Sequence, residues 1–181
     1  MTKTQHNLPP LQLDAIDLKI LHELQEDASL SNVDLAARVG LSSSPCLVRV
    51  KHLENSGVIL RRVTLLNPLS LGPTLSVFIH VALDKQTEVR LDAFESAMFN
   101  LAEVMECYLM SGDSDYLLRV VVSDLTALQH FIVEKLAKTS GVANIRSSFA
   151  LKQVKYKTAL PIRTLVDHDR KRPPPRKSSR R

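Results

Sequence analysis

The sequence predicts an α+β chain of two domains, a small helical one followed by one that mixes strands and helices. Two observations support this division. Apolar residues recur at helical spacing through the first third of the chain, whereas they alternate at strand spacing from Thr74 onward. The dipeptide Asn67-Pro68 lies between the two regions and favours a turn or linker there. We therefore expect the domain boundary close to Asn67.

The first helix is expected to begin near Leu13, because Leu13, Ile16, Ile20 and Leu24 share one face. Asp14 and Asp17 fall in its first turn, where carboxylates interact favourably with the helix dipole. A second, shorter helix is expected between the capping residue Ser31 and the terminating Gly40. Its predicted apolar positions are Val33, Leu35, Ala36 and Val39.

The third helix is expected to begin near Ser44, with Pro45 at the first helical position, and to end at Gly57. Helical phase predicts two opposite faces for this helix. The inward face holds Cys46, Leu47, Val50 and Leu53, and the outward face holds Ser44, Val48, Arg49 and His52. A β-rich stretch from Val58 to Leu66 follows and could form a wing.

The second domain is predicted to contain four strands and two helices. The expected segments are Thr74–Leu83 (strand), Glu88–Asn100 (helix), Val104–Met110 (strand), Tyr116–Val122 (strand), a helix capped by Asp124 and ending near Lys138, and an extended Val142–Tyr156. The order strand, helix, strand, strand, helix, strand is that of a ferredoxin-like βαββαβ domain. The expected boundaries are 1–12 (flexible arm), 13–66 (helical domain), 67–73 (linker), 74–160 (ferredoxin-like domain) and 161–181 (basic, disordered tail).

The net charge of +5 arises mainly from the C-terminal tail. From Arg163 onward there are eight Lys/Arg and two Asp/Glu, whereas the preceding 162 residues hold 16 basic and 17 acidic groups. Within the helical domain, residues 11–40 carry two basic and six acidic groups, and residues 41–63 carry four basic and one acidic. We expect the part around the third helix to attract phosphate and the other part to repel it.

Two helices joined by a short glycine turn form a helix-turn-helix, whose second helix enters the major groove of duplex DNA. Arginine is the commonest side chain on a guanine edge, and serine hydroxyls suit phosphate. The predicted DNA-binding residues are Ser43, Ser44, Val48, Arg49, Lys51, His52, Arg61 and Arg62. The alternative is that this is merely the polar face of a small helical bundle.

Several other functions are not expected. No apolar run reaches the roughly 18 residues of a membrane-spanning helix, and no signal peptide opens the chain, so we expect a cytoplasmic protein, which the predicted DNA contact would place at the bacterial nucleoid. Cys46 and Cys107 stand in no metal-ligand pattern, and Cys46 suits a small core residue. We find no nucleophile beside a base and no phosphate loop, so no catalytic residue, metal or cofactor is predicted.

The segment LDAIDLKILHELQEDASLSNVDLAARVGLSSSPCLVRVKHLENSGVI resembles the start of an Lrp/AsnC (feast/famine) regulator, and the similarity extends to Ile162. This resemblance implies a transcriptional regulator that binds double-stranded DNA as a dimer, tetramer or octamer and responds to an amino acid. The segment EVMECYLMSGDSDYLLRV is most similar to the subgroup that activates branched-chain keto-acid dehydrogenase operons. It also resembles Lrp-type regulators of cysteine or proline breakdown, and of these alternatives we favour leucine, isoleucine or valine as the effector.

The turn SGDSDY is a candidate effector site, although the same residues also suit an ordinary hairpin turn. An amino acid needs an anion for its ammonium group and donors for its carboxylate, which Asp113 or Asp115 and Ser147 or Ser148 could supply. The resemblance implies a wider set of effector residues: Leu109, Gly112, Asp113, Asp115, Tyr116, Leu125, Ser147, Ser148, Phe149 and Ala150. Ser148 and Phe149 stand where other members carry Tyr or Val, so the bound side chain stays open.

Two alternatives remain at this stage. The protein could organise DNA with little sequence preference instead of regulating particular genes. The Arg-rich tail, which departs from the family pattern, could add phosphate attraction or could be solvated without a role.

Overall fold

The computed structural model describes residues 12–162, which divide into two compact units. Unit 1 contains the chain up to Thr64 together with the part from Lys155 onward, and unit 2 runs from Leu65 to Val154. The chain therefore passes from one unit to the other twice. Most of the predicted flexible arm and of the predicted basic tail lies outside the described residues.

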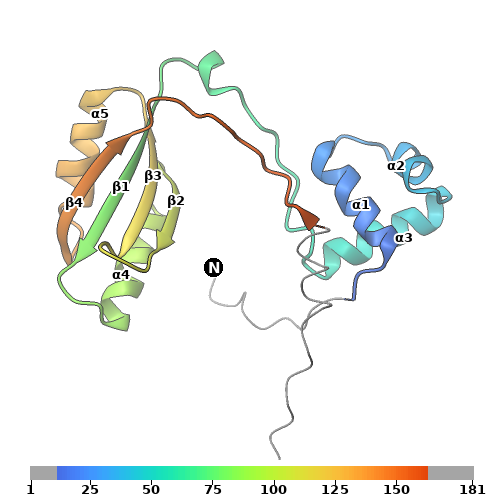
Figure 1. The fold of residues 1–181 in the computed structure, drawn as a ribbon, viewed down its shortest axis with the longest axis horizontal. Helices are drawn as coiled ribbons and strands as arrows, with labels where there is room; N and C mark the ends of the chain where they lie inside the picture. Colours follow the sequence, from blue (N-terminus) through green and yellow to red (C-terminus); the bar gives the residue numbers. More distant parts are fainter. Residues whose placement is uncertain (1–11, 163–181) are drawn as a thin grey trace, which may run out of the picture. The chain divides into compact units, whose positions relative to one another are not determined.

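Unit 1 is built on three helices, α1 (Ala15–Glu26), α2 (Asn32–Val39) and α3 (Ser43–Asn55) (Figure 1). Asp14 caps α1 and forms a reciprocal capping box with Asp17. Ser31 caps α2 by accepting a hydrogen bond from the Asp34 N–H, as predicted, and Gly40 ends it with a φ of 77°. The three helices enclose an apolar core that includes Ile20, Leu35, Cys46, Val50 and Leu53.

Three details of unit 1 differ from the sequence predictions. Val33 and Leu47 are not core residues, because their exposed fractions are 65% and 42%. Pro45 is the third residue of α3, not the first, because the helix begins at Ser43. Residues 58–66 form no strand, because the described part of unit 1 contains no second strand to complete the backbone hydrogen bonds.

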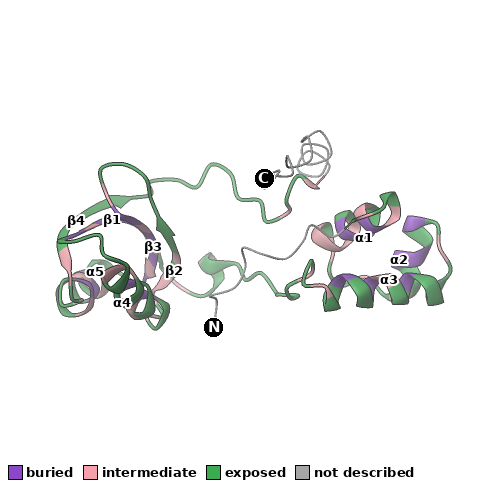
Figure 2. Ribbon diagram, turned by 90° about the horizontal axis from the view of Figure 1, so that it is seen from below, coloured by how far each residue is buried: buried purple, intermediate pink, exposed green. Residues whose placement is uncertain are grey.

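Unit 2 has the predicted ferredoxin-like βαββαβ order. It consists of β1 (Leu75–Leu83), α4 (Glu88–Phe99), β2 (Val104–Leu109), β3 (Tyr116–Val122), α5 (Leu125–His130) and β4 (Val142–Phe149). The strands form one antiparallel sheet in the order β2-β3-β1-β4. Helices α4 and α5 cover one face of this sheet, and the opposite face carries no helix (Figure 2). We call this opposite face the open face.

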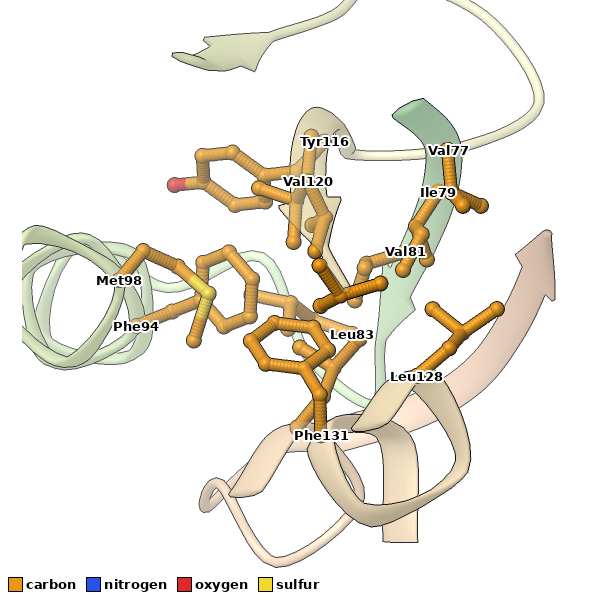
Figure 3. Close-up of a cluster of buried hydrophobic side chains, with 13 residues drawn as sticks. Val77, Ile79, Val81, Leu83, Phe94, Met98, Tyr116, Val120, Leu128 and Phe131 are labelled. Atoms are coloured by element: carbon orange, nitrogen blue, oxygen red, sulfur yellow. The ribbon is translucent and has the colours of Figure 1, made fainter. Parts of the chain in front are cut away.

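The core of unit 2 lies between the sheet and its two helices (Figure 3). Alternate residues of β1, from Val77 to Leu83, are buried, and so are alternate residues of β3, from Tyr116 to Val122. Phe94 and Met98 of α4 pack against them, and the Phe94 ring lies 4.5 Å from that of Tyr116, centroid to centroid. The alternation of apolar residues in β1 and β3 therefore gives the sheet one apolar face, and the two helices pack against that face.

The ends of two predicted elements in unit 2 differ from the structure. After Asp124 the helix is α-helical only to His130 and continues as a π-helix from Phe131 to Leu136. β4 ends at Phe149, opposite Val77 of β1, instead of at Tyr156, and one further hydrogen bond, from the Ala150 N–H to the Ser76 carbonyl at 3.2 Å, marks the point where the chain leaves the sheet. The chain beyond is exposed, and Leu151 is 98% exposed.

The segment 155–162, most of which was predicted to belong to the second domain, lies in unit 1. Its Leu160 N–H donates to Gln25 Oε1 of α1 at 2.8 Å, and Gln25 Nε2 donates to the Leu160 carbonyl at 3.3 Å. Ile162 is partly buried against the core of the three helices. One glutamine amide thus holds the returning backbone by both of its polar ends.

Candidate functional site

The outer face of α3 is the candidate nucleic-acid interface. Ser44, Val48, Lys51 and His52 are exposed on it, on the side opposite the buried Cys46, Val50 and Leu53. The N-cap residue Ser42 makes no side-chain cap, so the first N–H groups of α3 remain available to solvent or to a phosphate. These four side chains occupy the positions that the sequence predicted.

The orientation of α3 is fixed by contacts with both preceding helices. Asn32 Nδ2, at the start of α2, donates to the Ser43 carbonyl at the start of α3, with a distance of 2.8 Å. Gly40 supplies the left-handed conformation that the turn between the two helices requires. Arg38 of α2 in turn pairs with Glu23 of α1 at 3.0 Å. The helix-turn-helix is therefore held by a hydrogen bond between α2 and α3 and by an ion pair between α2 and α1.

Arg49, one of the predicted DNA-binding residues, makes ion pairs with α1. Its Nη1 lies 2.7 Å from Asp14 Oδ2 and 2.8 Å from Asp17 Oδ1, so the guanidinium joins α3 to the capping box of α1. The hydrogen bonds from the Asp17 N–H and from Arg49 hold the pKa of the Asp14 carboxyl below its usual value. With this donor shared by two carboxylates, Arg49 positions α3 against α1 in this structure, and its contact with DNA stays a prediction.

The two arginines beyond α3 also differ from one another. Arg62 Nη2 lies 3.1 Å from Glu54 Oε1 on α3, and its charge is therefore partly neutralised. Arg61 and Lys51 make no ion pair with any of residues 12–162. Both arginines lie in an irregular, exposed segment and not on the predicted wing strand.

A pocket of about 250 Å³ lies in unit 2, where the β2–β3 turn meets β1 and β4. Its lining residues are His80, Ala82, Asp113, Ser114, Asn144 and Arg146. Their position on the open face follows from the strand register, because His80 stands opposite Arg146 and Ala82 opposite Asn144. His80 Nδ1 lies 3.1 Å from Ser114 Oγ, which connects β1 to the turn.

Opposite charges meet across this pocket. Asp113 comes from the turn and Arg146 from β4, and neither makes an ion pair with a residue in the described part of the chain. Gly112, with a φ of 134°, allows the turn to place Asp113 here. A small zwitterionic ligand can therefore meet an anion and a cation at the same site.

Asp115 and Tyr116, two predicted effector residues, do not reach this pocket. Asp115 is 8% exposed, and its carboxylate accepts hydrogen bonds from the Leu83 N–H at 2.6 Å and from Gln86 Nε2 at 2.5 Å. Tyr116 is 1% exposed, and its hydroxyl donates to Glu95 Oε1 at 3.0 Å. Burial, followed by this hydrogen bond, raises the pKa of Tyr116. Both residues stabilise unit 2 from within.

The other predicted effector residues are divided between the two faces of the sheet. Ser148 pairs with Phe78 on the open face, whereas Ser147 and Phe149 pair with Ile79 and Val77, whose side chains are buried under the helices. Leu109 and Leu125 are exposed by 61% and 63%, and Ala150 follows the end of β4. Within a single chain these residues do not form one site.

Sequence reasoning missed five residues of the pocket, namely His80, Ala82, Ser114, Asn144 and Arg146. A signal for one of them was present. His80 interrupts the apolar run of β1, and a polar residue on the uncovered face of a strand is a candidate for ligand contact. Arg146 could not be placed beside it without the register of β4.

A helix-turn-helix followed by a ferredoxin-like domain with a charged pocket defines a class of protein, the ligand-responsive DNA-binding regulators. Residues 13–59 match the family described as winged helix-turn-helix DNA-binding, and residues 76–160 match the Lrp/AsnC ligand binding domain. The chain belongs to the Lrp/AsnC family of transcriptional regulators.

Similarity to individual proteins agrees with this assignment. The chain is 46% identical over 151 residues to the Bkd operon transcriptional regulator of Pseudomonas aeruginosa, with coverage of 83% of this chain and 99% of the relative. It is 42% identical over 156 residues to the leucine-responsive regulatory protein of Escherichia coli K12, with coverage of 86% and 95%. These relatives are named as regulators, so the prediction of a non-enzymatic role is confirmed.

Two crystal structures share the fold. A transcriptional regulator of Neisseria meningitidis in complex with L-methionine has a TM-score of 0.80 and 39% identity, and covers 84% of this chain and 99% of its own. An AsnC family regulator from Agrobacterium tumefaciens has a TM-score of 0.79 and 42% identity, with the same coverage. None of the helices within residues 12–162 is long and apolar enough to cross a lipid bilayer.

Proposed function

We propose that α3 contacts operator DNA and that the open-face pocket of unit 2 binds an amino-acid effector, which changes the affinity for DNA. The observation that carries the effector proposal is the pair of opposite charges, Asp113 and Arg146, around one pocket. The carboxylate of Asp113 suits the ammonium group of an α-amino acid. The guanidinium of Arg146 suits its carboxylate in a bidentate geometry.

A branched-chain amino acid is the proposed effector, supported by the names of two relatives. One is called a Bkd operon transcriptional regulator and the other a leucine-responsive regulatory protein. The pocket offers charged and polar partners for the main-chain groups of an amino acid. It offers little contact to an apolar side chain, because Ala82 is the single apolar residue that lines it. We propose that the protein acts at the nucleoid in the bacterial cytoplasm.

Self-association is part of the proposed mechanism. The outer edges of β2 and β4 have no partner strand within the described chain, and unpaired edges favour association. Large apolar side chains are exposed near these edges, including Leu109, which is 61% exposed, and Phe149, which is 49% exposed. An effector that binds one assembled arrangement more tightly than another would shift the population between them and so change DNA binding.

The DNA-binding proposal is tested by fluorescence anisotropy on the DNA upstream of the protein's own gene and on a scrambled sequence. Each amino acid is added in turn. We expect tighter binding to the upstream DNA and a shift in affinity with leucine, isoleucine or valine. Equal affinity for both sequences and no response to any amino acid would support a protein that organises DNA with little sequence preference.

The pocket is tested by isothermal titration calorimetry of the responsive amino acid into two variants, each with a matched control variant. Asp113→Asn and Arg146→Gln should each weaken effector binding at least tenfold, because each removes one charged partner. Asp84→Asn and Lys85→Gln are the matched controls, since both residues are exposed in the same unit. Unchanged affinity in Asp113→Asn and Arg146→Gln would place the effector elsewhere.

A further inference from the structure

Val48 is a large apolar side chain that the fold leaves exposed on α3. It lies in the N-terminal half of the helix, and its exposed fraction is 67%. The core of the three helices takes Cys46, Val50 and Leu53 from α3, and Val48 does not pack against it. A β-branched residue is also a poorer helix former than alanine or leucine. Neither burial nor helix propensity therefore accounts for a valine at this position.

The surroundings of Val48 on the outer face are mostly polar. Residues three and four positions apart are neighbours on a helix, and for Val48 these are Ser44, Pro45, Lys51 and His52, all of them exposed. Apart from Pro45 they carry hydroxyl, ammonium or imidazole groups. Such surroundings suit a small apolar group on a polar, negatively charged partner better than they suit a wide hydrophobic surface.

The length of this face matches the major groove of duplex DNA. From Ser44 to His52 the helix rises about 12 Å, and the groove is about 12 Å wide. The first N–H groups of α3 and the Ser44 hydroxyl suit the phosphates of one strand. Lys51, which makes no ion pair with residues 12–162, suits those of the other. Val48 then lies midway between them, over the edges of the bases.

The chemistry of valine leaves one group in the major groove that it can recognise. Base edges there present hydrogen-bond donors and acceptors, and the methyl groups of valine can bond to neither. The 5-methyl group of thymine is the apolar exception. We propose that Val48 is a specificity-determining residue that contacts a thymine methyl group in the operator. This inference rests on the proposed DNA-binding function and adds the base that one residue recognises.

The test removes thymine methyl groups from the DNA one at a time. The DNA upstream of the protein's own gene is prepared with each thymine in turn replaced by deoxyuridine, which pairs in the same way but lacks the 5-methyl group. Fluorescence anisotropy measures the affinity of each DNA for the unaltered protein, for Val48→Ala and for Val33→Ala. Val33 of α2 is the matched control, because its exposed fraction is 65% and it lies outside the predicted DNA-binding residues. Thermal unfolding checks that each variant folds.

We expect one thymine in each half-site to respond. Deoxyuridine there should weaken binding of the unaltered protein and of Val33→Ala about fourfold, as for one methyl group that loses an apolar contact. Val48→Ala should bind the thymine DNA about as weakly and should not respond to deoxyuridine at that position. In a second comparison, 5-methylcytosine should bind the unaltered protein more tightly than cytosine does at the same position, and Val48→Ala should not distinguish the two.

Three results would overturn the proposal. An equal loss in the unaltered protein and in Val48→Ala at every deoxyuridine position would assign the methyl contacts to other residues. Unchanged affinity at every position would exclude a methyl contact, and unchanged affinity of Val48→Ala for the thymine DNA would exclude a contact by Val48. Failure of the DNA-binding function itself would be distinct, since the unaltered protein would then not prefer the upstream DNA to a scrambled sequence.

Discussion

Arg49 shows how helical phase can place a side chain outside the core without revealing its partners within the protein. The phase of α3 predicts that Arg49 lies outside the core. Its side chain is partly exposed, on the flank of α3 that faces α1. Asp14 and Asp17, which the sequence assigned to the start of a helix, are also its partners. Local patterns identified each residue's element, but they could not show the ion pairs that join the two elements.

We predict that Arg49→Ala weakens binding to operator and unrelated DNA by the same factor and lowers the unfolding midpoint of unit 1. The reason is that α3 loses its link to the capping box of α1. His22→Ala is the control, because His22 of α1 is exposed, lies outside the predicted DNA-binding residues, and its side chain has no hydrogen-bond partner within residues 12–162. Loss on operator DNA alone, with an unchanged midpoint, would instead place Arg49 on a base.

Asp113 and Asp115 are two residues apart and differ in burial, because Asp113 is exposed and Asp115 is buried. Asp115→Ala should destabilise unit 2 by about 1–3 kcal/mol, because the buried Leu83 N–H loses its acceptor. Asp113→Ala should change the free energy of unfolding by less than about 0.5 kcal/mol, since Asp113 is exposed. Urea denaturation of both variants measures the difference. Equal stabilities would contradict the assignment of Asp115 to the interior.

At the scale of the elements, the sequence predicts most of the fold but misplaces the ends of several segments. Caps such as Ser31 and Asp124 and the alternation in β1 and β3 are local signals, and they were interpreted correctly. The ends of β4 and the absence of a strand in residues 58–66 depend on pairing partners far away in the sequence. His80 and Arg146 were missed for the same reason, because only the strand register brings them together beside the predicted Asp113.

The returning segment gives a prediction at this scale. Ile162→Ala should destabilise unit 1 by about 1 kcal/mol, less than for a fully buried isoleucine, because Ile162 is only partly buried. Leu151→Ala is the matched control, since Leu151 is 98% exposed. Hydrogen exchange of the α1 amides measures the effect. If exchange were equally fast in both variants and in the unaltered protein, the segment would not stabilise unit 1.

At the scale of the whole molecule, the two units have separate hydrophobic cores, one built around Ile20 and Leu53 and the other around Ile79 and Phe94. Calorimetry is therefore expected to resolve two unfolding transitions. An effector bound in the pocket should raise the midpoint temperature of the unit 2 transition alone. At a hundredfold excess over its Kd it adds about 2.7 kcal/mol to the free energy of unfolding of that unit. A shift of the other transition would place the effector in unit 1.

The double passage of the chain makes the ligand-binding unit an insertion into the DNA-binding unit, with junctions after Thr64 and before Lys155. A fragment that ends at Thr64 would be an incomplete DNA-binding unit, because it lacks Leu160 and Ile162. Exchanging ligand specificities between family members would consequently require two junctions per chimera. A hybrid that keeps residues up to 64 and from 155 onward from this protein would retain its DNA preference together with its own C-terminal cations.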